Sequence, residues 1–174
     1  STRNNPLTPA ENYVLTNRIA GYHARFLDQT GSEYFTEEQF DDYYFGKGSS
    51  YPDINGSVGI LFEQAGFRGR IRETANGTRT LAFGIRNQFT VTRSTLEASL
   101  DLKNELLEFQ REFYHDALKL AAQDKVKAYI FGDEDDPEKT EKLCKLLTAH
   151  QIDVYQNPRT IEKDGHKYSP GKSY

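Results

Sequence analysis

Hydrophobic positions recur with helical spacing near the start of the chain. They are separated by three or four residues: Leu15, Ile19, Tyr22 and Phe26. Thr8-Pro9-Ala10-Glu11 has the pattern of a capping box with proline at the first helical position, and Gly31 follows as a stop signal. The pattern predicts a helix over residues 9–29.

Two further capping patterns predict two more helices in this part of the chain. Thr36-Glu37-Glu38-Gln39 predicts a short helix that ends before Gly46. Ser94-Thr95-Leu96-Glu97 predicts a long helix that continues to about residue 122. One face of that long helix carries these apolar residues: Leu106, Phe109, Phe113, Ala117 and Leu120.

Strand patterns lie between these helices. Ser57 to Glu63 is a short, nearly continuous apolar run, which is typical of a strand buried on both faces. Gly59 inside it indicates the close approach of another element. Asn76-Gly77 lies between residues 69–75 and 79–85, where alternating apolar positions predict a hairpin.

The tail has a different pattern. Residues 126–131 and 152–155 are short apolar runs that predict strands. Asp136-Pro137 between them predicts the start of a helix that continues to about residue 149. A strand, a helix and a strand in this order form the repeating unit of a parallel α/β domain. The tail therefore predicts a small α/β unit.

Composition limits the classes of function. The chain has 174 residues and a net charge of −4, from 22 Lys and Arg against 26 Asp and Glu. No basic cluster dominates, which argues against nucleic acid as the main partner. No apolar run approaches the ~20 residues that span a bilayer, and no signal-peptide pattern opens the chain. The single Cys excludes an internal disulfide. The chain has no Met, so we expect it to be a processed product or a piece of a longer protein.

Glu63 is the residue whose position suggests chemistry. It ends the apolar run, and a carboxylate at the end of an interior strand is partly desolvated. Desolvation raises the proton affinity of a carboxylate, which suits it to general-base catalysis. The structural alternative is an ion pair between Glu63 and Arg68 or Arg70.

The segment from Gly46 to Gln64, GKGSSYPDINGSVGILFEQ, resembles the C-terminal half of zinc metallocarboxypeptidases of the carboxypeptidase A-like family. Large bacterial members are the most similar, and the resemblance covers residues 4–110. It implies that Glu63 activates a zinc-bound water and passes the proton to the leaving amine. It also implies that Tyr43 or Tyr44, on a loop before this strand, binds the terminal carboxylate of the substrate.

The chain departs from the family in its zinc ligands. The family has a His-x-x-Glu motif and a later His, all upstream of the region that this chain resembles. None of the four His here has Glu three residues later, as the motif requires, and none has a His partner at helical spacing: His23, His115, His150 and His166. We therefore assign no metal ligand in this chain and expect zinc to be a cofactor of the longer protein only.

Other patterns have structural explanations. Gly46-Lys47-Gly48-Ser49-Ser50 follows a helix and precedes a strand, which is the reverse of a phosphate-binding loop. Asp133 to Asp136 lacks the spacing of a calcium loop and is typical of a solvated turn that caps a helix. Cys144 is expected to be packed within a helix.

Together these features predict an α/β fold. Residues 1–110 would be the later part of a carboxypeptidase-like mixed sheet flanked by helices, and residues 111–174 a linking helix and a second small α/β unit. The expected function is zinc-dependent hydrolysis of C-terminal residues of peptides. This isolated chain is expected to be inactive, and the remainder of the longer chain to be its partner. The alternative is a non-catalytic binding or scaffold module with the same fold. The resemblance implies a periplasmic or secreted bacterial protein.

Overall fold

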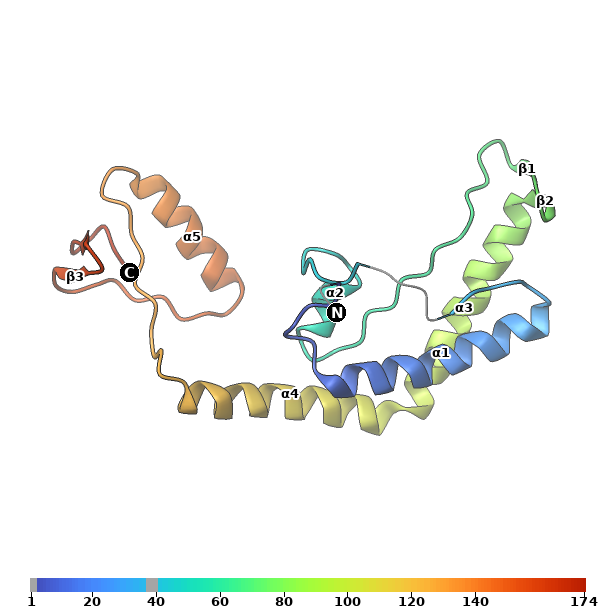
Figure 1. Ribbon diagram of the computed structural model, residues 1–174, viewed down its shortest axis with the longest axis horizontal. Helices are drawn as coiled ribbons and strands as arrows, with labels where there is room; N and C mark the ends of the chain where they lie inside the picture. The colour runs from blue at the N-terminus through green and yellow to red at the C-terminus, as the bar shows by residue number, and fades with distance from the viewer. Residues whose placement is uncertain (1–2, 37–40) are drawn as a thin grey trace. The chain divides into compact units, whose positions relative to one another are not determined.

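A computed structural model describes residues 3–36 and 41–174 of the chain (Figure 1). The chain divides into two compact units, Ser1–Leu120 and Ala121–Tyr174. The elements are, in chain order, α1 (Ala10–Thr30), α2 (Ser50–Asp53), β1 (Ile71–Thr74), β2 (Gly77–Thr80), α3 (Leu81–Asp101), α4 (Lys103–Gln123), α5 (Pro137–Ala149), β3 (Ile161–Lys163) and β4 (His166–Tyr168).

The described residues form a mostly helical structure, with five helices and two small antiparallel hairpins, β1–β2 and β3–β4. They contain no larger mixed sheet, so the predicted sheet flanked by helices is not present. Residues 57–63 are extended but form no ladder with another strand. An extended segment needs a neighbouring strand to satisfy its backbone groups, and a hydrophobicity pattern does not show whether one is available.

The first helix confirms its sequence pattern except at its cap. α1 covers Ala10–Thr30, and Gly31 ends it with φ 65°, the left-handed conformation that glycine adopts without a steric penalty. The predicted capping box is not formed. Pro9 occupies the N-cap position, and the buried hydroxyl of Thr8 has no hydrogen-bond partner among the described residues.

The core of the first unit lies where α1 packs against α3 (Figure 1). Ile19, Ala98 and Leu102 are buried together. Partly buried residues pack around them: Tyr22, Val58, Ile60 and Leu106. Both helices contribute to this cluster, and Val58 and Ile60 of the extended segment pack against it.

The Asn76-Gly77 signal is confirmed as a hairpin, but its second strand is shorter than predicted. β1 pairs with β2 in register from Ile71 opposite Thr80 to Thr74 opposite Gly77. Residues 81–85 are helical instead, because the side chain of Thr80 accepts a hydrogen bond from the backbone N of Phe83 and caps α3. Three alternating apolar residues are too few to distinguish a strand from the first turn of a helix.

The long helix predicted from Ser94 to about residue 122 is two helices, α3 and α4. Its predicted end is confirmed, since α4 ends at Gln123, but its predicted start is wrong. α3 already begins at Leu81, so Ser94 lies inside a helix rather than at an N-cap. α3 ends at Asp101, and the chain turns at Leu102, which is 3% exposed, before α4 begins at Lys103. Burial of Leu102 against α1 accounts for the turn between the two helices.

Of the short helix predicted between Thr36 and Gly46, residues 37–40 lie outside the described residues, and residues 41–45 are not helical. The next helical element is the single turn α2 at Ser50–Asp53.

The second unit confirms the predicted helix but not the predicted strands. Asp136 caps α5 by accepting a hydrogen bond from the N of Lys139, with Pro137 at the first position. Residues 126–131 and 152–155 form no strand. Phe131 pairs instead with the C-terminal Tyr174 through two backbone hydrogen bonds of 3.1 and 2.9 Å, and their rings stack. The strand–helix–strand unit is therefore replaced by a helix beside an antiparallel hairpin and the chain end.

Among the described residues, no helix combines the length and the apolar character needed to cross a lipid bilayer.

Candidate functional site

The segment that carries the carboxypeptidase resemblance is anchored on the first turn of α1. Asn12 is 1% exposed, and its Nδ2 donates to Asp53 Oδ1 and to the carbonyl oxygen of Ser57, both at 2.9 Å. Asp53 Oδ1 also accepts a hydrogen bond of 2.7 Å from the backbone N of Gly59. These contacts hold α2 and the start of the extended segment against one buried amide.

A second carboxyl group belongs to this anchor. Ser50 is fully buried and its hydroxyl donates to Asp42 Oδ1. Asp53 is 4% exposed, and burial raises its pKa to about 6. The hydrogen bonds from Gly59 and Asn12 oppose this increase, whereas the carboxyl of Asp42 adds to it. The carboxyl group of Asp53 is therefore protonated at a higher pH than the carboxyl group of an ordinary Asp.

Gly59 is required by a close backbone approach, as its position in the apolar run predicts. A Cβ at this position would lie 1.8 Å from the carbonyl oxygen of Ser49. Real Cβ atoms do not approach that closely, so any other residue at position 59 would push the backbone at Ser49 away from the extended segment.

Tyr43 and Tyr44 lie beside this anchor, and both side chains are exposed. The backbone of Tyr43 is fixed: its carbonyl oxygen accepts from Asn5 Nδ2 at 2.8 Å, and its N donates to Asp41 Oδ1. The ring of Tyr44 lies against Gly46, where a Cβ would be 2.4 Å from a ring carbon. Tyr43 is 54% exposed and Tyr44 60%, so both side chains are accessible to solvent.

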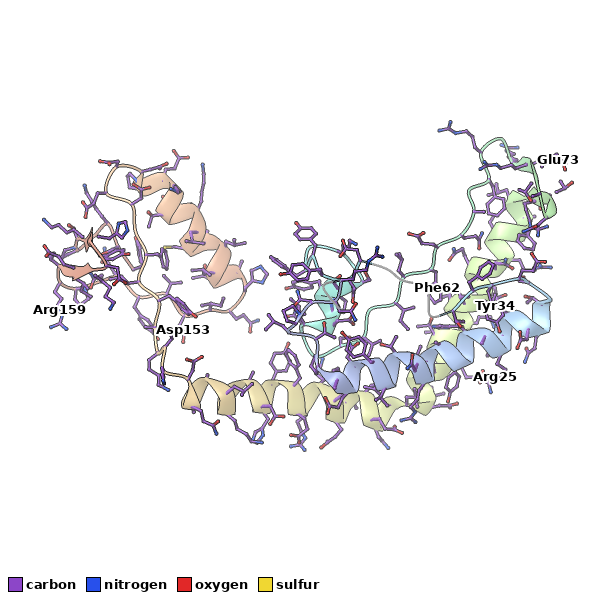
Figure 2. The ribbon with its side chains drawn as sticks, in the orientation of Figure 1. Arg25, Tyr34, Phe62, Glu73, Asp153 and Arg159 are labelled. Carbon is purple, nitrogen blue, oxygen red and sulfur yellow. The ribbon has the colours of Figure 1, made fainter. Side chains whose placement is uncertain are left out.

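Glu63 lies in the extended segment between two aromatic contacts. Phe62, before it (Figure 2), forms a T-shaped ring contact with His23 of α1, with 4.7 Å between ring centroids and 78° between ring planes. Phe67, after it, packs on α3 at Gly84, where a Cβ would be 2.1 Å from a ring carbon of Phe67. The segment thus crosses from α1 to α3, and Glu63 lies between its two attachments.

The expected burial of Glu63 is not present. Its side chain is exposed, and it forms no ion pair with Arg68, Arg70 or any other residue in the ranges 3–36 and 41–174. A strand buries its side chains only when neighbours cover both of its faces, and here no strand pairs with residues 57–63. The structural alternative of a Glu–Arg pair is likewise not formed.

His23 is a second buried titratable group of the first unit, besides Asp53. It is 6% exposed, and its Nδ1 lies 2.6 Å from the hydroxyl of Ser94. That hydroxyl donates to the carbonyl oxygen of Val91, so the proton of the His–Ser bond belongs to Nδ1. Nε2 is buried without a partner in the described part of the chain, and burial lowers the pKa of His23. The contact joins α1 to α3, which is a structural role for this His.

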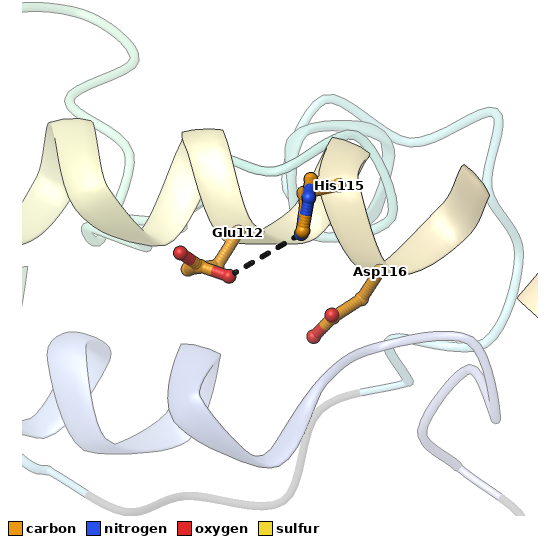
Figure 3. A group of neighbouring side chains, drawn as sticks. All are labelled: Glu112, His115 and Asp116. Carbon is orange, nitrogen blue, oxygen red and sulfur yellow. Dashed lines mark ion pairs between the residues drawn. The ribbon is translucent and has the colours of Figure 1, made fainter. Parts of the chain in front are cut away.

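The described residues contain one group of side chains with metal-ligand atoms close together. Glu112, His115 and Asp116 lie on one face of α4, with ligand atoms within 4.8 Å of one another (Figure 3). Glu112 precedes His115 by three residues, so a pattern of His followed by an acid does not include it. The group is solvent-accessible, and its acids pair with neighbouring cations: Glu112 with Arg111, and Asp116 with Lys119.

The acidic stretch before α5 confirms the capping interpretation. Asp133 Oδ1 accepts from the backbone N of Asp135 and of Asp136, and Oδ2 pairs with Lys139 at 3.0 Å. These bonds use the carboxylate within the turn. Cys144 is partly buried in α5, where burial raises the pKa of its thiol.

Comparison of the chain with protein-family models, with curated protein sequences and with solved structures found no match.

Proposed function

We propose that this chain is the later part of a zinc carboxypeptidase-like protein that hydrolyses C-terminal residues of peptides. The proposal rests first on the resemblance of residues 46–64, and the structure adds a physical argument in its favour. The resembling segment has specific internal contacts: the buried hydrogen bond between Asn12 and Asp53, and a close backbone approach at position 59 that only glycine permits.

The observation that carries the proposal is the exposed apolar run before Glu63. Leu61 is 50% exposed and Phe62 36%, although the run has the composition of an interior strand. No backbone hydrogen bond joins Ile60–Gly66 to another described segment. Apolar residues with unpaired backbone groups are expected where the neighbouring strands belong to another part of a longer chain.

In this proposal Glu63 is the general base, which takes a proton from the attacking water, and Tyr43 or Tyr44 binds the terminal carboxylate of the peptide. Zinc supplies carbonyl polarisation and a more acidic water in such enzymes. The residues of this chain do not fit a catalytic zinc site, because the acids near His115 are exposed and paired with cations. The zinc ligands of the proposal therefore lie outside this chain, and we derive no step through the metal.

Two measurements test the proposal. Elemental analysis of the dialysed 174-residue chain should find essentially no zinc, whereas one tightly held zinc per chain would show that the ligand assignment is wrong. In the longer protein, Glu63→Gln should lower kcat for a peptide substrate by about 10²–10⁴-fold with KM little changed.

The matched control is Glu73→Gln, an equally conservative change at an exposed residue of β1 (Figure 2). It should leave turnover unchanged. If the longer protein folds but hydrolyses no peptide, the alternative of a non-catalytic binding module replaces this proposal. If Glu63→Gln retains full activity, the general base is another residue.

A further inference from the structure

The segment from Gln64 to Arg86, which contains the hairpin β1–β2 and the start of α3, is rich in arginine (Figure 1). It has five arginines, no lysine and one acid, Glu73, in a chain whose net charge is −4. A local excess of one charge indicates a surface for a partner of opposite charge. We call these residues the arginine cluster: Arg68, Arg70, Arg72, Arg79 and Arg86.

The fold brings four of these arginines together around the start of α3. The carbonyl oxygen of Arg70 accepts a hydrogen bond of 2.8 Å from the N of the first residue of α3. Arg72 lies directly opposite Arg79 in the register of the hairpin. The guanidinium groups of Arg79 and Arg86 both lie over the ring of Phe83, 5.2 and 5.1 Å from its centroid. The fold therefore concentrates charges that the sequence shows as separate positions, whereas composition alone argued against a nucleic acid partner.

Few carboxylates neutralise the arginine cluster. Among the described residues, Arg79 is the one member with an ion pair, to Glu33 Oε2 at 3.6 Å. Glu73 belongs to the other face of the hairpin from Arg72, because side chains alternate along a strand. Its carboxylate accepts from the hydroxyl of Thr78, at 2.8 and 3.0 Å. The four other arginines of the cluster are exposed, so their charges are available to a partner.

Two members of the cluster oppose the stability of the hairpin. Like charges directly opposite each other on two strands are destabilising, and Arg72 faces Arg79 in this way. Arg70 has φ 70°, a left-handed conformation that is uncommon for a residue of its size. Residues that break local rules of stability are expected at functional sites.

The composition of the hairpin favours a nucleic acid over an acidic protein surface. Beside the arginines it has Thr74, Asn76, Thr78 and Thr80, polar residues of the kinds that contact phosphate and sugar. A protein interface needs large apolar or aromatic side chains at its centre. Ile71 is the one such residue on the two strands, and it lies on the face opposite to the arginines.

A polymer of phosphates suits the cluster better than a single small anion. An exposed ion pair contributes little by itself, because water and salt screen it. Several phosphates on one backbone add their contributions through the release of condensed counterions. The planar guanidinium group of arginine also donates two parallel hydrogen bonds to one phosphate.

We propose that the arginine cluster binds the sugar-phosphate backbone of a nucleic acid, without preference for base sequence. The four arginines that form no ion pair with a described carboxylate each contact one phosphate. This binding is independent of the proposed peptidase chemistry, in which none of these arginines has a role.

A fluorescein-labelled DNA duplex of about 20 base pairs tests the proposal, by fluorescence anisotropy with the full 174-residue chain. Four phosphate contacts predict a slope of about −3.6 when the logarithm of the affinity is plotted against the logarithm of the salt concentration. The affinity should therefore fall about 100-fold between 0.05 and 0.2 M salt. A second duplex of scrambled sequence should bind equally well.

Two matched substitutions locate the contact. Arg72→Gln should reduce the size of the slope by about 0.9, the contribution of one phosphate contact. Arg159→Gln removes the same charge from an exposed position of the second unit (Figure 2) and should leave the slope unchanged. Arg72→Gln should not lower the free energy of unfolding, because it removes a pair of like charges. Weaker binding by this variant then reflects the lost contact rather than a damaged fold.

Three outcomes would overturn the proposal. Absence of binding at 0.05 M salt would show that the cluster is not a docking surface. Equal slopes for Arg72→Gln and Arg159→Gln would show that the duplex binds elsewhere. Poly-glutamate that competes as strongly as unlabelled duplex, at equal total charge, would show that the cluster binds an acidic protein segment instead.

Discussion

The two sides of α3 differ in a way that reverses the usual arrangement of an amphipathic helix. The inner side, against α1, buries small and polar residues such as Ser94 and Ala98, both 0% exposed. The outer side leaves Phe89 and Leu100 mostly exposed. Burial of apolar area is the main stabilising contribution of packing, so the contact with α1 uses the weaker side of the helix.

The difference shows that the contact between α1 and α3 depends on close approach and hydrogen bonds rather than on large apolar side chains. Small residues on the inner side let the backbones of α1 and α3 approach closely, and hydrogen bonds specify the contact. Ser32 Oγ donates to Asn87 Oδ1 at 2.8 Å, and His23 bonds to Ser94 at 2.6 Å. The outer side has the bulk needed to bury area but no described neighbour that covers it. Three substitutions or conditions would break or sharpen this contrast.

The largest effect is expected from enlarging the inner side. Ala98→Leu adds three carbons at a fully buried position beside Ile19 and Leu102, and should lower the free energy of unfolding by about 2–3 kcal/mol through overpacking. Ala82→Leu makes the same change at an exposed position of α3 and should alter it by less than about 0.5 kcal/mol. Urea unfolding measures both, and equal effects would show that α1 and α3 do not pack tightly in solution.

A smaller effect is expected from pH through His23. Burial lowers the pKa of His23 in the folded protein, so the unfolded chain, with a value near 6.5, binds the proton more readily. The stabilising contribution of His23 is complete above pH 6.5 and is lost as pH falls through the lowered folded pKa. Urea unfolding at several pH values should show that, as pH falls below 6.5, the wild type loses stability relative to His23→Gln, whereas its difference from His115→Gln, at an exposed position, stays constant. An identical pH profile for wild type and His23→Gln would contradict the burial of this ring.

The smallest effect is expected on the outer side. Leu96→Ser should change the free energy of unfolding of the isolated chain by less than about 0.5 kcal/mol, because Leu96 is 67% exposed and loses little buried area. Thermal and urea unfolding provide the measurement. A loss of more than 1 kcal/mol would show that another part of the chain already covers the outer side.

Local sequence signals predicted the helices whose ends depend on nearby residues. Gly31 ends α1, Asp136 caps α5, and Asn76-Gly77 forms the turn of the first hairpin. In each case the residue that decides the structure lies within a few positions of the element. Gly59 was also interpreted correctly as a site of close approach, although the pattern did not show that Ser49 is the neighbour.

The strands and the anchor depended on residues far along the chain. Residues 57–63 have a strand's composition, but a ladder needs a partner strand, and none is formed with the described residues. Asn12 and Asp53 are separated by 41 residues, and nothing in either local pattern indicates that they meet. Ser94 shows the same limit, because its capping pattern is overridden by a helix that starts at Thr80 and by its bond to His23. The roles assigned to Glu63, Tyr43 and Tyr44 remain predictions.

The buried Asp53 has a consequence for the proton balance of folding. Its folded pKa of about 6 lies above the ordinary value of 3.8, so between these pH values the folded chain retains a proton that the unfolded chain releases. Folding of the anchor therefore takes up a proton in mildly acidic solution, while burial of His23 opposes proton binding below pH 6.5. The two groups shift the proton balance of folding in opposite directions.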